Sequence, residues 1–168
     1  RDAMEHKKSR RREPEDSRGA PRTLPMGLYR ASELERNTPK EDTNALSLLQ
    51  GEGRVIEVVG NARLTVAVQW TARIQDLGAA VIWLNLREDG FFPPDLAANG
   101  VRLDLLPIIR PETKEQSVEA IDTIMRSGFF SLLVVDWNPK WALEGALQTR
   151  FFRLGRRHGV TLVVLAEE

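Results

Sequence analysis

Short apolar runs alternate with amphipathic segments along the last two-thirds of the chain. The apolar runs lack the strict polar alternation of a half-exposed sheet, which is typical of strands buried on both faces. The segments between them carry apolar residues at helical spacing, and Gly78 and Gly128 follow two of them as expected at helix ends. The pattern predicts strands at 54–59, 79–86, 103–109, 131–137 and 160–167, with helices at 64–78, 114–128 and 141–159 and a short helix near 91–101.

Strands interleaved with helices in this way predict the fold class. Parallel strands need long crossover connections, and helices of 12–18 residues supply them. We therefore expect an α/β domain with a mainly parallel central sheet flanked by helices on both faces.

The N-terminal part of the chain has a different composition. Residues 1–25 hold eight basic and five acidic side chains and almost no large apolar ones, so we expect a disordered charged tail. Residues 26–50 predict a short helix and a polar linker, with Leu28, Tyr29 and Leu34 as its apolar positions. The α/β core is assigned to residues 51–168.

Composition removes several classes of chemistry. The 168 residues include no cysteine, which excludes disulfides, cysteine-ligated zinc and thiol catalysis. The two histidines, His6 and His158, lie far apart, and we expect no metal site. Lys+Arg and Asp+Glu are 24 each, so net charge points to no particular partner. No apolar run approaches the roughly 20 residues that span a membrane.

The turn after the first predicted strand resembles a shortened phosphate-binding loop. A working loop, GxxxxGK[ST], wraps phosphates with backbone N–H groups and adds a Lys and a hydroxyl. Here the turn lacks about three residues, the second Gly and the Lys, and Arg63 falls where the Lys would stand. We expect either a plain strand–turn–helix connection or a weak nucleotide site. Its residues are Gly60, Asn61, Ala62, Arg63, Leu64 and Thr65.

Two acidic residues follow other predicted strands. Asp136 ends the run Leu132–Val135, where an ATPase carries the Asp that orients magnesium. Without the Lys and hydroxyl of the loop, Asp136 is interpreted as a relic of that site. Glu88 lies near the position where such an ATPase carries its catalytic Glu. Aligning the chain from Gly78 places Arg87 at that position, whereas aligning it from Gly100 places Glu88 there. We therefore expect no catalytic residue.

Arginines collect on the last predicted helix. Spacings of three and seven place Arg150, Arg153 and Arg157 on one face, with Arg156 beside them and only Glu144 to offset their charge. They suit DNA phosphates, an acidic partner or a solvated helix face. In the tail, the alternatives are likewise contact with phosphates, contact with an acidic surface or simple solvation. The basic residues concerned are Lys7, Lys8, Arg10, Arg11 and Arg12.

Several of these segments together resemble a known family. GRVIEVVG, the helix reaching Gln69, LAANGVRLDLLPIIRPETKEQSVEAIDTIMRSG and LLVVDW resemble the core of RecA, a P-loop NTPase fold. Within that superfamily, LYRASEL at 28–34, PPDLAANGV at 93–101 and the RSG before the Asp136 strand are similar to ImuA, the RecA/SulA-related family of bacterial mutagenesis cassettes.

The resemblance implies a function that the residues alone do not. It implies a non-catalytic accessory protein of damage-induced mutagenesis and translesion synthesis, cytoplasmic and nucleoid-associated, that binds and inhibits RecA without a cofactor. It also implies association with ImuB and an error-prone polymerase, with Leu28, Tyr29 and Leu34 as the docking element. The alternatives are a residual DNA-stimulated ATPase and a DNA-binding module.

Overall fold

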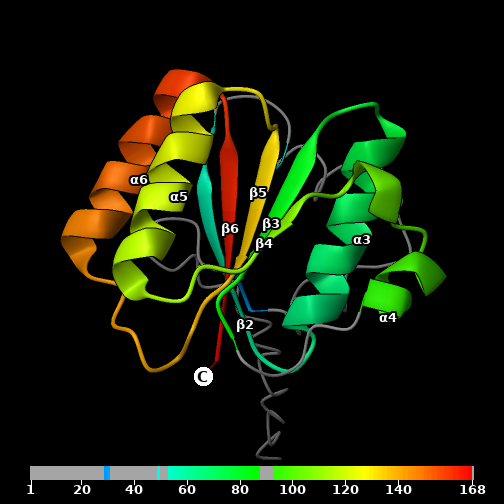
Figure 1. Ribbon diagram of the computed structural model, residues 1–168, viewed down its shortest axis with the longest axis horizontal. Helices are drawn as coiled ribbons and strands as arrows, with labels where there is room; N and C mark the ends of the chain where they lie inside the picture. The colour runs from blue at the N-terminus through cyan, green and yellow to red at the C-terminus, as the bar shows by residue number, and fades with distance from the viewer. Residues whose placement is uncertain (1–28, 31–48, 50–52, 88–92, 168) are drawn as a thin grey trace, which may run out of the picture.

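A six-stranded sheet, parallel throughout, forms the centre of the molecule. The computed structural model describes residues 29–30, 49, 53–87 and 93–167. The sheet has the order β1-β2-β6-β5-β3-β4 (Figure 1). Its strands are β1 (Tyr29–Arg30), β2 (Val55–Val59), β3 (Val81–Asn85), β4 (Ile108–Ile109), β5 (Leu132–Asp136) and β6 (Thr161–Ala166).

Helices cover both faces of this sheet. On one side lie α3 (Arg63–Asp76) and the short α4 (Pro93–Ala98), and on the other lie α5 (Lys114–Ser127) and α6 (Gly145–His158), side by side (Figure 1). Each predicted crossover helix is present, and the predicted parallel α/β architecture is confirmed. None of the helices in the described residues is long and apolar enough to cross a membrane.

Two apolar cores lie on the two faces of the sheet. One packs α3 and α4 against the sheet around Trp83, whose side chain is fully buried. Its indole Nε1 donates to Thr71 Oγ1 at 2.9 Å, so the buried N–H is satisfied by α3. The other packs α5 and α6 against the sheet around Phe151 and Met125. Trp70 is also buried, so both it and Trp83 serve packing.

A close backbone approach joins α6 to the start of β2. Gly53 and Gly155 face one another so tightly that a Cβ on Gly53 would lie 1.9 Å from the carbonyl oxygen of Gly155. A Cβ on Gly155 would lie 2.8 Å from the carbonyl oxygen of Val160. Both positions therefore require the absence of a side chain, rather than a special backbone angle.

Three of the expected elements differ from the structure. The strand expected at 103–109 is a 3₁₀ turn, Leu103–Leu105, followed by the two-residue β4, and Leu103 and Leu105 are exposed. Pro107 lies between the two parts; it has no N–H to donate, and its carbonyl accepts from Trp83 N at 3.0 Å. The prediction of one strand over 103–109 is therefore wrong, because Pro107 divides this leucine- and isoleucine-rich segment into a turn and a short strand.

The other two differences concern where helices form. The helix expected from residue 141 begins at Gly145, because the preceding chain turns and Trp141 O accepts from Trp137 Nε1 at 2.8 Å. The helix expected around Tyr29 is wrong at Tyr29 and Arg30, which form β1 through backbone pairing with Val58 and Val59. Leu28 and Leu34 lie outside the described residues, as does the predicted tail.

Candidate functional site

The carboxyl ends of four adjacent strands define the candidate site. In open parallel sheets, ligands bind outside this edge. β2, β6, β5 and β3 are neighbours and in register, so the residues that follow them meet there. These residues are Gly60 after β2, Glu167 after β6, Asp136 at the end of β5 and Arg87 after β3.

The turn after β2 is short and closes on itself. Gly60 has φ 102°, in the left-handed region that favours glycine, and α3 begins three residues later at Arg63. The Gly60 carbonyl accepts from the backbone N of Arg63 at 3.2 Å and from its Nη1 at 3.3 Å. Asn61 and Thr65 are exposed, and the apolar neighbours Ala62 and Leu64 pack against the α3-side core.

An ion-pair cluster occupies the middle of the site. Oε1 of Glu167 lies 3.0 Å from Arg63 Nη2 and 2.6 Å from Arg87 Nη1. The two arginine side chains are each 14% exposed, against 42% for Glu167. The Glu167 carboxylate, at the end of β6, therefore links α3, which follows β2, to the loop that follows β3.

Asp136 is the deepest residue at this edge. It is 1% exposed, and its carbonyl accepts from Leu86 N at 3.1 Å, which extends the pairing of β5 with β3. Its register partner Asn85 is also buried and accepts from Arg87 N through Oδ1 at 3.1 Å. The ring of Trp137, the next residue, packs in the core under α5 and α6, edge-on to Trp141.

Sequence reasoning found part of this cluster. It singled out the Gly60–Thr65 turn and Asp136, which the sheet brings to one edge, but it gave no role to Glu167. Glu167 directly follows β6 and Arg87 lies two residues after the end of β3, so the rule that parallel strands end at one edge places both residues near that edge. Glu88 lies outside the described residues, as do the predicted tail contacts Lys7, Lys8, Arg10, Arg11 and Arg12.

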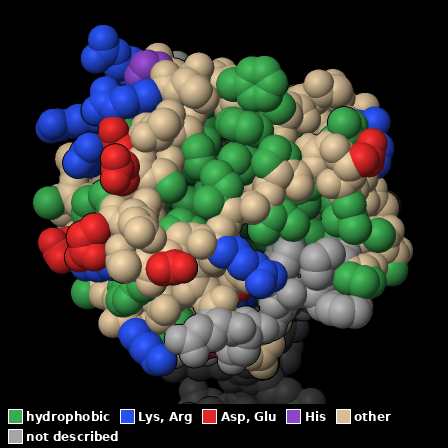
Figure 2. Space-filling view, in the orientation of Figure 1, with side chains coloured by type: hydrophobic (Ala, Val, Ile, Leu, Met, Phe, Trp, Pro, Cys, Tyr) green, Lys and Arg blue, Asp and Glu red, His purple; other side chains and the backbone are tan. Residues whose placement is uncertain are grey.

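A second charged surface lies on α6. Arg150, Arg153, Arg156 and Arg157 are all exposed. Lys and Arg side chains gather over the C-terminal ends of α5 and α6, at the upper left of Figure 2. Arg156 also lies over the ring of Phe152, 5.9 Å from its centroid.

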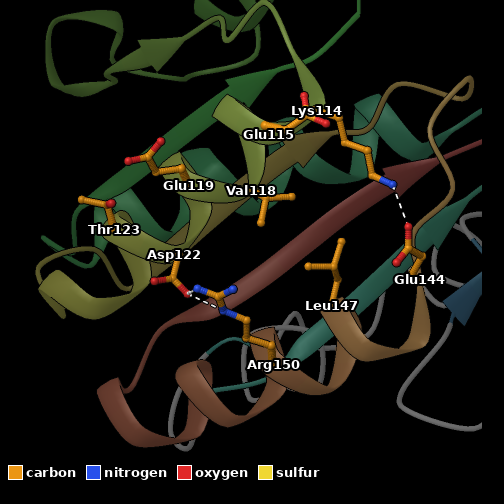
Figure 3. Close-up of a pocket in the computed structure, with 9 residues that line it drawn as sticks. All are labelled: Lys114, Glu115, Val118, Glu119, Asp122, Thr123, Glu144, Leu147 and Arg150. Carbon is orange, nitrogen blue, oxygen red and sulfur yellow. Dashed lines mark hydrogen bonds and ion pairs between the residues drawn. The ribbon is translucent and has the colours of Figure 1, made fainter.

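The charges that offset these arginines differ from the expected ones. Glu144 pairs instead with Lys114 Nζ at 3.1 Å, and Asp122 of α5 provides the carboxylate for Arg150, at 2.7 Å from its Nη2. The two bridges lie at opposite ends of an open groove of about 560 Å³ between α5 and α6, with Val118 and Leu147 between them (Figure 3).

Asp122 itself is held by two arginines. Burial alone would raise its pKa, but hydrogen bonds from Arg126 Nε at 2.6 Å and Arg150 Nε at 2.8 Å outweigh burial and lower the pKa below its ordinary 3.8. Among the described residues, no three histidine or acidic side chains come close enough together to hold a metal ion.

The fold and the edge chemistry together define a class of protein. A doubly wound parallel domain with a strand–glycine turn–helix at its carboxyl edge has the architecture of the RecA-like P-loop proteins. The chain belongs to the RecA N-terminal domain family, whose model matches residues 46–157.

Individual relatives agree with this membership. The chain is 36% identical to the protein RecA of Parvibaculum lavamentivorans over 102 residues, which cover 56% of this chain and 28% of that protein. It is 29% identical to the protein RecA of Brevibacillus brevis over 134 residues, 73% of this chain and 38% of that protein. The chain thus spans about a third of the length of these curated relatives.

A solved structure shares the fold. SulA from Pseudomonas aeruginosa superimposes with a TM-score of 0.57 at 12% identity, covering 68% of this chain and 98% of that chain. At this identity the likeness concerns the fold alone.

Proposed function

We propose that this chain is a non-catalytic RecA-like accessory protein that acts by binding RecA and inhibiting it. The observation that carries the proposal is the closed Gly60–Arg63 turn, whose arginine bonds back to the turn and to Glu167. A working phosphate loop instead presents free backbone N–H groups and a lysine to the nucleotide. A protomer-shaped domain that does not hydrolyse ATP is suited to capping or interrupting a RecA filament.

The finer part of the proposal follows the ImuA resemblance. We propose a role in damage-induced mutagenesis and translesion synthesis, in association with ImuB and an error-prone polymerase. The docking element is the N-terminal segment with Leu28, Tyr29 and Leu34. In bacteria, such a protein would act in the cytoplasm, at the nucleoid.

RecA-mediated strand exchange tests the central claim. We expect the purified chain to slow strand exchange and to co-sediment with RecA filaments on single-stranded DNA. A double variant, Leu28→Ala with Leu34→Ala, should lose both effects. Leu77→Ala is the matched control, because it removes an exposed leucine at the end of α3, far from the N-terminal segment in sequence. An unchanged exchange rate at saturating protein would refute RecA binding as the function.

ATP turnover tests the non-catalytic part separately. We expect the unsubstituted chain to hydrolyse ATP no faster than the Asp136→Ala variant does, with or without single-stranded DNA. Turnover that Asp136→Ala abolishes would instead establish a residual ATPase that uses this edge of the sheet.

A DNA-binding function is the second candidate, and the exposed arginines of α6 favour it. It predicts that DNA binding weakens as salt concentration rises. The double variant Arg153→Ala with Arg157→Ala should lower the slope of log binding constant against log salt concentration by up to about 2 in magnitude, because two phosphate contacts are lost. Arg73→Ala, an exposed arginine on α3, serves as control. Equal slopes for the double variant and the control would exclude α6 as the DNA surface.

A further inference from the structure

The outer side of the α5–α6 pair forms one face with two distinct ends. Both helices cross from the carboxyl end of one parallel strand to the amino end of the next, so they run in the same direction, side by side (Figure 1). Their last turns also approach one another, because a Cβ on Gly128 would lie 3.5 Å from the carbonyl oxygen of His158. The first turns of both helices therefore lie at one end of this face and the last turns at the other.

Acidic side chains predominate at the end of this face where the helices begin. Three carboxylates stand there against one lysine, namely Glu115, Glu119 and Glu144 against Lys114. Glu144 is bound to Lys114, whereas Glu115 and Glu119 are exposed and bind no described residue. The latter two are four positions apart in α5, so they lie one turn apart on the same side of the helix. The loops before the helices carry three more charged residues and leave this end with an excess of one negative charge: Arg110, Glu112 and Lys140.

Arginines predominate at the end where the helices finish. Four of them stand there against one aspartate, namely Arg126, Arg150, Arg153 and Arg157 against Asp122. Asp122 already binds two of the four, Arg126 and Arg150. Arg153 and Arg157 are exposed, bind no described residue and lie one turn apart on α6. Figure 2 shows Lys and Arg side chains gathered at the upper left, with Asp and Glu side chains below them on the same side.

We propose that the α5–α6 face binds the same face of a second copy of the chain, antiparallel and about a two-fold axis. Such an axis brings the acidic end of each copy to the basic end of the other. Glu115 and Glu119 of one copy then meet Arg153 and Arg157 of the other, twice, and both pairs share the spacing of one helical turn. The half-buried Val118 and Leu147 of the groove lie between the two charged ends and supply the apolar middle of the contact.

The size of the face limits the strength of this contact. Each helix has 14 residues, which makes it about 21 Å long and about 10 Å wide. The face therefore measures about 400 Å² per copy, less than the roughly 800 Å² per partner of a standard interface. Because its contacts are largely ion pairs that salt screens, we expect a reversible dimer that forms at low ionic strength and dissociates as salt is added. The contact involves neither RecA nor the N-terminal segment, so it is independent of the proposed function.

Complementary charge reversal tests the dimer. Sedimentation equilibrium of the full chain at low salt, without RecA or DNA, gives the dimer dissociation constant. Two double variants, Glu115→Lys with Glu119→Lys and Arg153→Glu with Arg157→Glu, should each weaken self-association at least about tenfold, because like charges then face each other. An equimolar mixture of the two variants should regain the affinity of the unsubstituted chain, because both contacts again join opposite charges.

Asp76→Lys with Asp104→Lys is the matched control. It makes the same change in net charge as the glutamate reversal, but at exposed residues on the α3 side, and should dimerise as the unsubstituted chain does. A chain that stays monomeric at low salt would overturn the proposal, as would a mixture that associates no better than its components or a control that weakens equally. Oligomers larger than dimers would also overturn it, since a two-fold contact ends at two copies. If a double variant fails to fold, the single reversals Glu119→Lys and Arg153→Glu replace the pair, with the same recovery expected on mixing.

Discussion

At the scale of single residues, the close approach of α6 to the start of β2 depends on two glycines, which have no side chain. Gly53 and Gly155 come together where any Cβ would meet backbone atoms, which cannot move aside as the tip of a flexible side chain can. Gly155 also lies 3.4 Å, measured from its ideal Cβ position, from Met125 Cε of α5. The contact therefore fixes the position of the helix that carries the basic surface.

Gly155→Ala should destabilise the protein by about 1–3 kcal/mol, the usual cost of forcing an extra carbon into a packed interior. Gly145→Ala in the same helix should be neutral or stabilising by about 0.5 kcal/mol, because a Cβ there meets nothing within 4 Å. Urea denaturation of both variants measures the difference. Equal stabilities would show that the close approach does not constrain α6.

Residue patterns predicted some members of the candidate site and missed others. The glycine turn and Asp136 carry recognisable local signals, a tight turn after a strand and an acid at a strand end. Glu167 also follows a strand end, but its pairing with Arg63 and Arg87 depends on β6 lying between β2 and β5, and only the sheet order reveals that. Pairing across 80 or 104 residues, as with Arg87 and Arg63, leaves no mark in local spacing.

At the scale of elements, a carboxylate bridge links the two helices on one face. Asp122 of α5 binds Arg126 one turn away. It also binds Arg150 on α6 (Figure 3). The arginine side chains are about half exposed, at 55% and 49%, so solvent screens much of each interaction. The bridge is therefore expected to contribute little to the stability of the fold.

Asp122→Asn should cost about 0.5–1 kcal/mol at neutral pH, the range for partly exposed ion pairs. Because the folded state lowers the pKa of Asp122, the stabilisation is complete above the ordinary pKa of 3.8 and is lost as pH falls through the lowered value. The difference in unfolding free energy between the two proteins should thus shrink below pH 4.

Chemical denaturation at a series of pH values measures this difference. Glu119→Gln is its control, since it removes a charge from the same helix without touching the bridge. A gap between Asp122→Asn and the unsubstituted chain that stays constant down to pH 2 would rule out the ionised bridge as its cause.

Helices and strands were predicted well where periodicity and ends agree. At the start of α5, the Thr113 side chain accepts from Gln116 N at 3.2 Å, and at its end Gly128 has a left-handed backbone. The local sequence therefore signals both ends of this helix. The strand prediction for 103–109 was wrong because leucines occur both in strands and in an exposed 3₁₀ turn such as this one. Hydropathy alone cannot register that Pro107 has no backbone N–H to donate.

At the scale of the whole molecule, the sheet is shared by two cores. Val134 and Trp83 face α3, whereas Val135 and Leu84 on the same two strands face α5 and α6. Loss of either core exposes the other face of the same strands. The two faces should therefore unfold as one cooperative unit.

Tryptophan variants test this cooperativity. In Trp137→Phe with Trp141→Phe, the remaining tryptophans Trp70 and Trp83 report on the α3 side. In Trp70→Phe with Trp83→Phe, the remaining pair reports on the α5–α6 side. Within each variant, the urea midpoint by fluorescence should coincide with that by far-ultraviolet circular dichroism. Non-coincident midpoints would indicate two separable halves.

The order of strands along the chain also has a consequence for synthesis. β6 is the last described strand in sequence, yet it sits between β2 and β5 and pairs with both along its length. Until residues 161–166 have left the ribosome, β2 has no neighbour on that side and the pair β3–β5 has an open edge. A nascent chain would hold two unjoined parts of a sheet and complete them in a single late step.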